Sequence, residues 1–148
     1  MLVKILDACD SQAIAQVADL EAAIFSDAWS EKEVASTVNQ RQSLCAVALE
    51  ADRVVGYFLC YYVLDECEIA RIAVAQDARR TGVGNALFMY LLELCDERSI
   101  ERILLDVRAG NAGAIAFYKR NGFEIDGLRK GYYAGSQPED AVLMSRQV

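Results

Sequence analysis

Apolar residues recur along the chain with two different spacings, and these spacings predict an ordered succession of strands and helices. Continuous or alternating apolar runs are typical of strands. We expect strands over residues 2–6, 44–49, 54–64, 68–75, 103–107, 123–128 and 141–144. Apolar residues three or four positions apart indicate helices. We expect helices over residues 12–25, from 30 onward, over 85–94 and from 111 to 122.

Capping residues mark the ends of these helices. Asp10 stands before the first helix, and a capping box of Ser30 and Glu33 opens the second. Asn111 has the same place before the last helix. Gly122 is suited to end it, because glycine adopts the left-handed conformation that follows many helices.

The connections between the strands predict the topology of the sheet. Short turns join the three strands between residues 44 and 75, so these strands run antiparallel. A helix lies between strands 68–75 and 103–107, so these two run parallel. The last two strands close the sheet as an antiparallel pair. The sequence therefore predicts an α/β fold: a mixed, mostly antiparallel sheet of about six to seven strands, with helices on both faces.

The loop over residues 79–84, Arg-Arg-Thr-Gly-Val-Gly, indicates a phosphate site. Its glycines let a phosphate approach the backbone closely, and it leads into a helix whose first N–H groups lack carbonyl partners. The helix dipole also favours an anion there, and Arg79 and Arg80 add positive charge. Common nucleotide motifs do not match: no GxxxxGK[ST] is present, and Leu87 replaces the third glycine of GxGxxG.

A second pattern lies in residues 111–123. Asn111 and Tyr118 are seven positions apart, which is about two helical turns, so both point from one face. The rest of that face is small or apolar, which favours a ligand lying along it. A helix cap and a core tyrosine would produce the same spacing.

Together the two segments resemble the GNAT acetyltransferases. Residues 79–84 match that family's (Q/R)xxGx(G/A) motif, and residues 111–123 match its later motif of an asparagine, an Ala-Ile-x-x-Tyr core and Gly-Phe. Within the family, the chain resembles members that acetylate the N-terminal alanine of a small-subunit ribosomal protein. Four further stretches carry this closer resemblance: residues 25–32, 72–74, 105–109, and 132–133 with 139–141.

The resemblance implies a GNAT fold that binds acetyl-CoA, without a metal. Strands 68–75 and 103–107 would splay apart at a β-bulge and form the acetyl-CoA cleft. The implied cofactor-binding residues are Ile72, Ala73, Val74, Arg79, Arg80, Thr81, Gly82, Val83, Gly84, Asn85, Asn111 and Tyr118.

The resemblance also implies catalytic roles. Tyr118 would act as the general acid that protonates the departing thiolate. The general base is open: Asp106 stands where the similar enzymes have a glutamate, Glu68 on the adjacent strand competes with it, and either could act through a water. Asp106 could instead be a buried carboxylate that accepts backbone N–H groups. Trp29, Tyr132 and Tyr133 would contact the acceptor.

We expect this 148-residue chain to be one domain. Its composition also limits the kinds of catalysis and binding partner that it can have. The absence of histidine excludes imidazole-based catalysis and imidazole metal sites, and a net charge of -7 opposes direct nucleic-acid binding. No apolar run has the length of a membrane helix. Five cysteines without CxxC spacing are typical of reduced thiols in a cytoplasmic protein. Acetylation of a small amine or another protein N-terminus, and CoA binding without catalysis, remain the alternatives.

Overall fold

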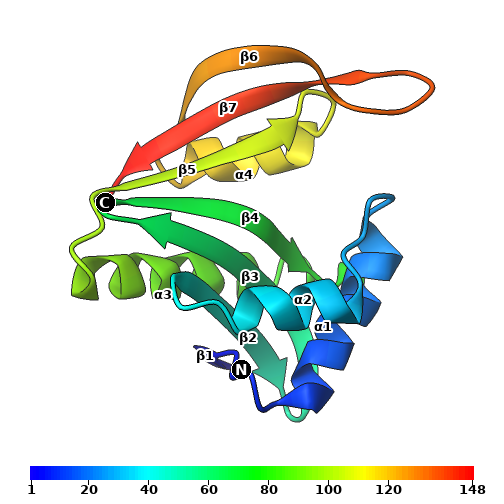
Figure 1. Cartoon of the computed structure of the whole chain (residues 1–148), viewed down its shortest axis with the longest axis vertical. Helices are drawn as coiled ribbons and strands as arrows, with labels where there is room; N and C mark the ends of the chain where they lie inside the picture. The colour runs from blue at the N-terminus through cyan, green and yellow to red at the C-terminus, as the bar shows by residue number, and fades with distance from the viewer.

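Seven strands form one sheet with helices on both faces in the computed structural model, which describes all 148 residues (Figure 1). The strands are β1 (Leu2–Ile5), β2 (Ser43–Glu50), β3 (Arg53–Val63), β4 (Glu66–Val74), β5 (Arg102–Arg108), β6 (Glu124–Tyr133) and β7 (Glu139–Gln147). The helices are α1 (Ser11–Ile24), α2 (Glu31–Val38), α3 (Val83–Glu97) and α4 (Ala112–Arg120), with a 3-10 turn η1 (Gln76–Ala78) before α3. None of them combines the length and apolar character needed to cross a membrane.

The order of strands in the sheet is β1-β2-β3-β4-β5-β7-β6, and β4 and β5 are its parallel pair. All other neighbouring strands are antiparallel. The predicted mixed, mostly antiparallel sheet is therefore confirmed. The predicted caps are also present: the side chains of Asp10, Ser30 and Asn111 each accept a backbone N–H from the first turn of their helix.

Several elements differ in length from the prediction. Helix α3 begins at Val83, two residues before the predicted start, because Gly82 takes the N-cap position with a φ of 88°. Strands β6 and β7 extend well beyond the predicted 123–128 and 141–144. Most residues of β6 are solvent-exposed, so its sequence lacks the apolar pattern on which the prediction depended.

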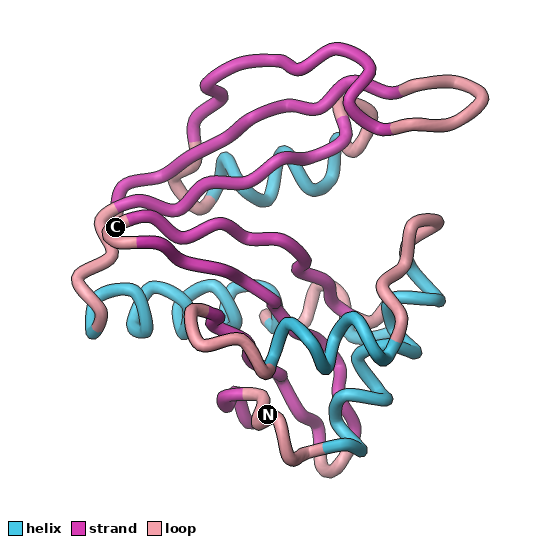
Figure 2. The backbone as a smooth tube through the Cα atoms, viewed as in Figure 1, coloured by secondary structure: helices cyan, strands magenta, loops and turns pink.

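Strands β4 and β5 pair along only part of their length. Their register joins Glu66–Ile69 to Arg102–Leu105 and goes no further. An extra residue in β4 coincides with this point: Cys60 of β3 faces Ile69 and Leu59 faces Arg71, so Ala70 has no partner. We call the separated stretch, residues 70–74 of β4 and 106–108 of β5, the fork (Figure 2). The predicted splaying at a β-bulge is thus confirmed.

Two apolar cores cover the two faces of the sheet. Helices α1 and α2 pack on one face, and α3 packs on the other together with Tyr118 of α4 and Phe123 (Figure 1). Alternate residues of β4 and β5 point into the α3-side core, among them Cys67, Ile69 and Leu105. The residues between them therefore face the α1–α2 side.

Gly56 of β3 lets α3 lie directly against the sheet. A Cβ atom there would be 2.9 Å from Cγ1 of Val83, 3.0 Å from Cδ1 of Leu87 and 3.1 Å from the carbonyl oxygen of Ala73. Because one of these atoms is backbone and the other two belong to packed core side chains, the space cannot be made by rotating a free side chain. The absence of a side chain at Gly56 therefore determines how closely the N-terminus of α3 packs against the sheet beside the fork.

We expect Gly56→Ala to lower the free energy of unfolding by about 1–3 kcal/mol, the usual cost of adding a methyl group to a packed core. Urea unfolding followed by circular dichroism measures this change. Gly113→Ala is the control, because a Cβ there meets nothing within 4 Å. Equal stability of Gly56→Ala and the wild-type protein would contradict the proposed packing constraint.

Candidate active site

The fork opens into a cavity of about 1210 Å³. This is larger than the roughly 300–1,000 Å³ of most small-molecule pockets, and its lining includes residues of both separated strands. Its walls come from the α1–α2 loop, β4, the start of α3, the end of β5, α4 and the end of β6. The cavity therefore collects residues that lie far apart in the sequence.

One end of the cavity contains the predicted phosphate loop. Arg79, Arg80, Gly82, Gly84 and Asn85 line it. The N–H of Ala86 is the first to bond within α3, to the Gly82 carbonyl at 3.0 Å, which leaves the preceding N–H groups of the helix without intrahelical partners. Arg79 is fixed beside the end of β4 because its Nε donates to the Val74 carbonyl at 3.2 Å.

Two predicted loop residues have their side chains elsewhere. The hydroxyl of Thr81 donates to the Ala78 carbonyl, and Val83 is buried in the core beneath Gly56. Neither side chain lines the cavity. Only their backbone N–H groups are therefore available to an anion at the helix N-terminus.

The middle of the cavity is bounded by open strand edges. Ile72, Ala73 and Val74 line it, and β3 occupies only one edge of β4 along this stretch. The backbone groups that point away from β3 have no strand partner. A bound ligand with amide groups can take the place that β5 leaves, because extended backbone offers alternating donors and acceptors.

Tyr118 of α4 reaches the cavity from the α3 side. It is 7 % exposed, its ring packs against Phe117 and Phe123, and its hydroxyl forms no hydrogen bond within the protein. Burial raises the pKa of Tyr118 well above its usual value, so the phenol keeps its proton at neutral pH. Asn111, at the start of the same helix, also lines the cavity, while its Oδ1 accepts from the Ala114 N–H at 3.1 Å.

Glu68 and Asp106 reach the cavity from the opposite face of the sheet. Glu68 faces Leu104 in the register, so Asp106 lies two positions further along the neighbouring strand on the same face. Both line the cavity, and the backbone N–H groups that bond to carboxylates in this protein bond to other acids, namely Asp7, Asp10, Glu21, Glu33, Glu139 and Asp140. The structure thus gives no support to Asp106 as a carboxylate held by backbone N–H groups.

The environment of Glu68 favours its protonated form. Glu68 is exposed at the cavity wall, yet the surrounding protein partly desolvates its carboxyl, and this raises its pKa. The negative charge of Asp106 raises the pKa further, while Arg129 opposes the shift. The charge of Asp106 therefore acts on the carboxyl of Glu68 near the base of the fork.

Of the three residues predicted to contact the acceptor, two lie at the cavity and one does not. Tyr132 and Tyr133 line the cavity, with the guanidinium of Arg129 4.8 Å from the first ring and that of Arg108 4.2 Å from the second. Trp29 does not line it. Its indole packs on the α1–α2 side near Arg71, at 5.5 Å from the guanidinium.

A buried charge network behind the cavity was not predicted from the sequence. Glu21 of α1 is fully buried and accepts from Nε of Arg71 at 2.9 Å, from the Trp29 N–H at 3.0 Å and from the hydroxyl of Tyr57. Burial and this bond raise the pKa of Tyr57 well above its usual range. Glu21 follows Ile14 and Val17 on the apolar stripe of α1. An acidic residue at a position where the pattern expects an apolar one is the sequence feature that could have indicated this buried network.

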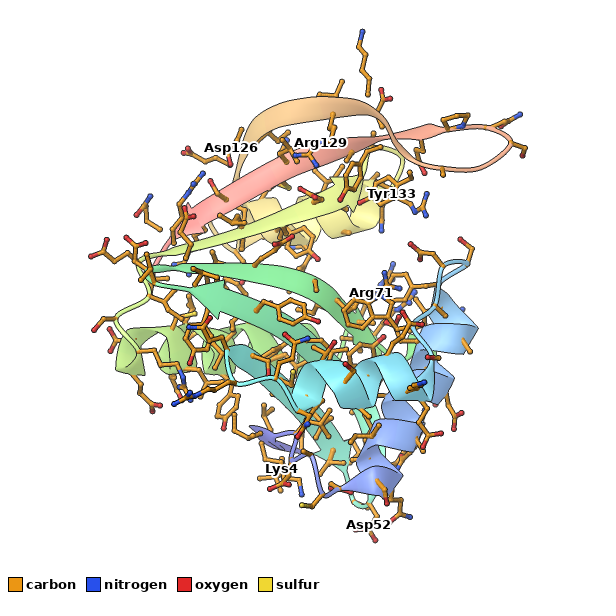
Figure 3. The ribbon with its side chains drawn as sticks, viewed as in Figure 1. Lys4, Asp52, Arg71, Asp126, Arg129 and Tyr133 are labelled. Carbon is orange, nitrogen blue, oxygen red and sulfur yellow. The ribbon has the colours of Figure 1, made fainter.

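Arg71 lies on the cavity wall one residue beyond the bulge, opposite Tyr133 across the opening (Figure 3). Its guanidinium also lies 3.4 Å from Asp27 of the α1–α2 loop. Asp27 in turn lies 3.5 Å from Arg108, which is 3.4 Å from Glu139. These charges surround the side of the cavity where the carboxylate pair lies.

The model of the acetyltransferase (GNAT) family matches residues 14–123 of the chain. The chain belongs to the GNAT family. The family motifs fall on the cavity: Arg79, Arg80, Gly82 and Gly84 of the first motif line one end, and Asn111 and Tyr118 of the second line its wall. The structure thus brings the two segments that carried the resemblance to one site.

Individual GNAT proteins show how near the relationship is. The [ribosomal protein bS18]-alanine N-acetyltransferase of Escherichia coli (strain K12) is 36% identical over 118 residues, 79% of this chain and 79% of that protein. The crystal structure of the ribosomal-protein-S18-alanine N-acetyltransferase from Escherichia coli superposes with a TM-score of 0.89 over 99% of this chain and 93% of that one, at 29% identity. An aminoglycoside 6'-N-acetyltransferase complexed with coenzyme A shares the fold, with a TM-score of 0.88 at 18% identity and coverage of 99% and 97%.

We expect the carboxyl of Glu68 to titrate above the ordinary glutamate value, and two variants to move its midpoint in opposite directions. Asp106→Asn removes a neighbouring negative charge, so the pKa of Glu68 falls. Arg129→Gln removes a neighbouring positive charge, so the pKa rises. Carboxyl-carbon NMR of the wild-type protein and both variants measures the midpoints. Shifts in the same direction, or none, would show that the two groups do not act on Glu68.

Proposed function

We propose that this GNAT protein transfers the acetyl group of acetyl-CoA to the N-terminal α-amine of a protein, namely the N-terminal alanine of ribosomal protein bS18. The observation that carries the proposal is the fork, which has a protonated tyrosine on one side and a pair of carboxylates on the other. The 36% identity to the Escherichia coli bS18-alanine N-acetyltransferase supports the choice of acceptor.

The residues of the cavity fit acetyl-CoA. The diphosphate would lie at the N-terminus of α3, where free N–H groups and the guanidiniums of Arg79 and Arg80 offer charge complementarity. The pantetheine amides would bond the open edge of β4 over residues 72–74. The thioester would then lie within the fork, because the fork continues from the phosphate end to the last paired residues.

The proposed reaction is direct transfer. Acetyl-CoA supplies the activated thioester, the acceptor nitrogen forms a bond to the acetyl carbon, and the carbon–sulfur bond breaks. Tyr118, whose phenol is protonated at neutral pH, donates its proton to the departing thiolate. The ammonium proton of the acceptor passes to Glu68 or Asp106, directly or through a water.

An α-amine suits this carboxylate pair better than a lysine side chain does. An α-amine has a pKa of roughly 7.7–8.0, against about 10.4 for lysine, so an appreciable fraction is already neutral at pH 7. A carboxylate such as Glu68, whose pKa is raised, can accept the proton of the remaining ammonium form. Positioning the two reactants then contributes much of the rate enhancement.

We expect the protein to acetylate a peptide that begins with alanine and to leave a peptide with a blocked N-terminus and an internal lysine unmodified. Mass spectrometry of both peptides after incubation with acetyl-CoA measures this preference. Alanine-first peptides from several proteins and small primary amines, tested at equal concentration, identify the preferred acceptor. Faster modification of the lysine or of a small amine would discard the N-terminal proposal and leave the fold assignment intact.

We expect Tyr118→Phe to lower kcat by about a hundredfold or more, the usual contribution of a general acid. Its affinity for acetyl-CoA, measured by calorimetry, should change little, because the hydroxyl makes no hydrogen bond that holds the cavity together. Tyr90→Phe is the control, since Tyr90 lies on α3 outside the cavity. Unchanged kcat in Tyr118→Phe would contradict the assigned role. A wild-type protein that binds acetyl-CoA but acetylates none of the tested amines would instead favour a module that only binds CoA.

A further inference from the structure

Asp27 connects the two strands of the fork on the side opposite Tyr118. Its Oδ1 lies 3.4 Å from a terminal nitrogen of Arg71 on β4, and its Oδ2 lies 3.5 Å from a terminal nitrogen of Arg108 on β5. All three residues line the cavity. The two oxygens of Asp27 thus face one guanidinium each. Two guanidiniums would hold the carboxylate of a ligand in the same arrangement.

Arg71 does not depend on Asp27 for its position. Its terminal nitrogen lies 2.7 Å from the fully buried carboxylate of Glu21, and its guanidinium lies 4.3 Å from the centre of the Phe25 ring. Its side chain is only 12% exposed. The guanidinium would therefore stay in place if the Asp27 carboxylate were removed.

Arg108 is likewise held by other contacts. Its guanidinium lies 4.2 Å from the centre of the Tyr133 ring and 3.4 Å from the carboxylate of Glu139. Asp27 is the exposed member of this pairing, with 48% of its side chain accessible against 33% for Arg108. Truncation of Asp27 would thus leave two fixed guanidiniums facing an accessible space.

The charge of this cluster decides which acceptors it admits. Three carboxylates face two guanidiniums, which leaves one excess negative charge: Glu21, Asp27 and Glu139 against Arg71 and Arg108. The approach of an acceptor's ammonium is therefore favoured. A carboxylate on the acceptor would find the guanidiniums of Arg71 and Arg108 already paired with Asp27. The excess negative charge of the cluster would then repel it.

We infer that Asp27 occupies a carboxylate site formed by Arg71 and Arg108, and that it thereby excludes amines that carry a carboxylate beside the amine, such as free amino acids. This makes Asp27 a specificity-determining residue of the acceptor side. The inference rests on the proposed function, because it takes this side of the cavity to receive the amine.

The decisive comparison uses alanine and alaninamide as acceptors, since they differ only in the carboxylate. For each protein the ratio of kcat/KM for alaninamide to kcat/KM for alanine is measured. The two amines differ in basicity, but this difference is the same for every variant and cancels when ratios are compared. We expect Asp27→Ala to lower the ratio at least about tenfold, the effect of one hydrogen bond to a charged group.

Two further variants test whether the effect comes from the charge of Asp27 and from its position. Asp27→Asn preserves the shape of the side chain while removing its charge, so it should shift the ratio in the same direction by a smaller factor. Asp52→Ala is the matched control, because Asp52 is an exposed acid in the β2–β3 turn, far from Arg71 (Figure 3). A ratio in Asp27→Ala that stays within twofold of the wild-type ratio would overturn the inference.

A binding measurement separates this inference from the proposed function. Calorimetry compares N-acetylalanine with N-acetylalaninamide, neither of which has an amine to acetylate. We expect Asp27→Ala to bind N-acetylalanine at least about tenfold more tightly than the wild-type protein does, and to bind N-acetylalaninamide equally. No gain would overturn the inference even if peptides are acetylated. Failure to acetylate any peptide would overturn the proposed function while this gain still stood.

Discussion

The separation of β4 from β5 is the constraint on which the rest of the molecule depends. Parallel strands normally continue their hydrogen bonds, and leaving those groups open inside a protein is costly unless water or a ligand takes them. Here the pairing stops at Ile69 and Leu105, next to the extra residue Ala70. The bulge changes the direction of β4 within one residue, so the opening is built into the backbone before any ligand arrives.

The buried carboxylate of Glu21 fixes one wall of this opening. A buried ion pair contributes little net stability, because the cost of desolvating both charges opposes their attraction. The contribution of Glu21 is therefore to hold its partners in fixed positions. Glu21 bonds to Tyr57 of β3, to Arg71 of β4 and to the backbone of the α1–α2 loop at Trp29. Three separate segments are thus held in one arrangement, and the guanidinium of Arg71 is aimed at the cavity beside the bulge.

The sequence identified those parts of the site that are local, and it missed those that depend on long-range folding. The loop over residues 79–84 and the pair Asn111 and Tyr118 each lie within one helix or its start, where spacing determines which side chains share a face. The sequence places Glu68 on the strand adjacent to that of Asp106, because a helical crossover makes the two strands parallel, and the register then brings both to one face. The contact of Asp27 with Arg108 joins a loop to a distant strand end, and no periodic pattern marks it.

The alternation of side chains in the fork separates the two proton transfers of the proposed reaction. Cys67, Ile69 and Leu105 point into the α3-side core that contains Tyr118, whereas Glu68 and Asp106 point to the other face. The group that gives up a proton and the groups that accept one thus reach the same cavity from opposite faces of the sheet. The two proton transfers of the proposed reaction can therefore use different groups, because the fork is open to both faces of the sheet where β4 and β5 no longer pair.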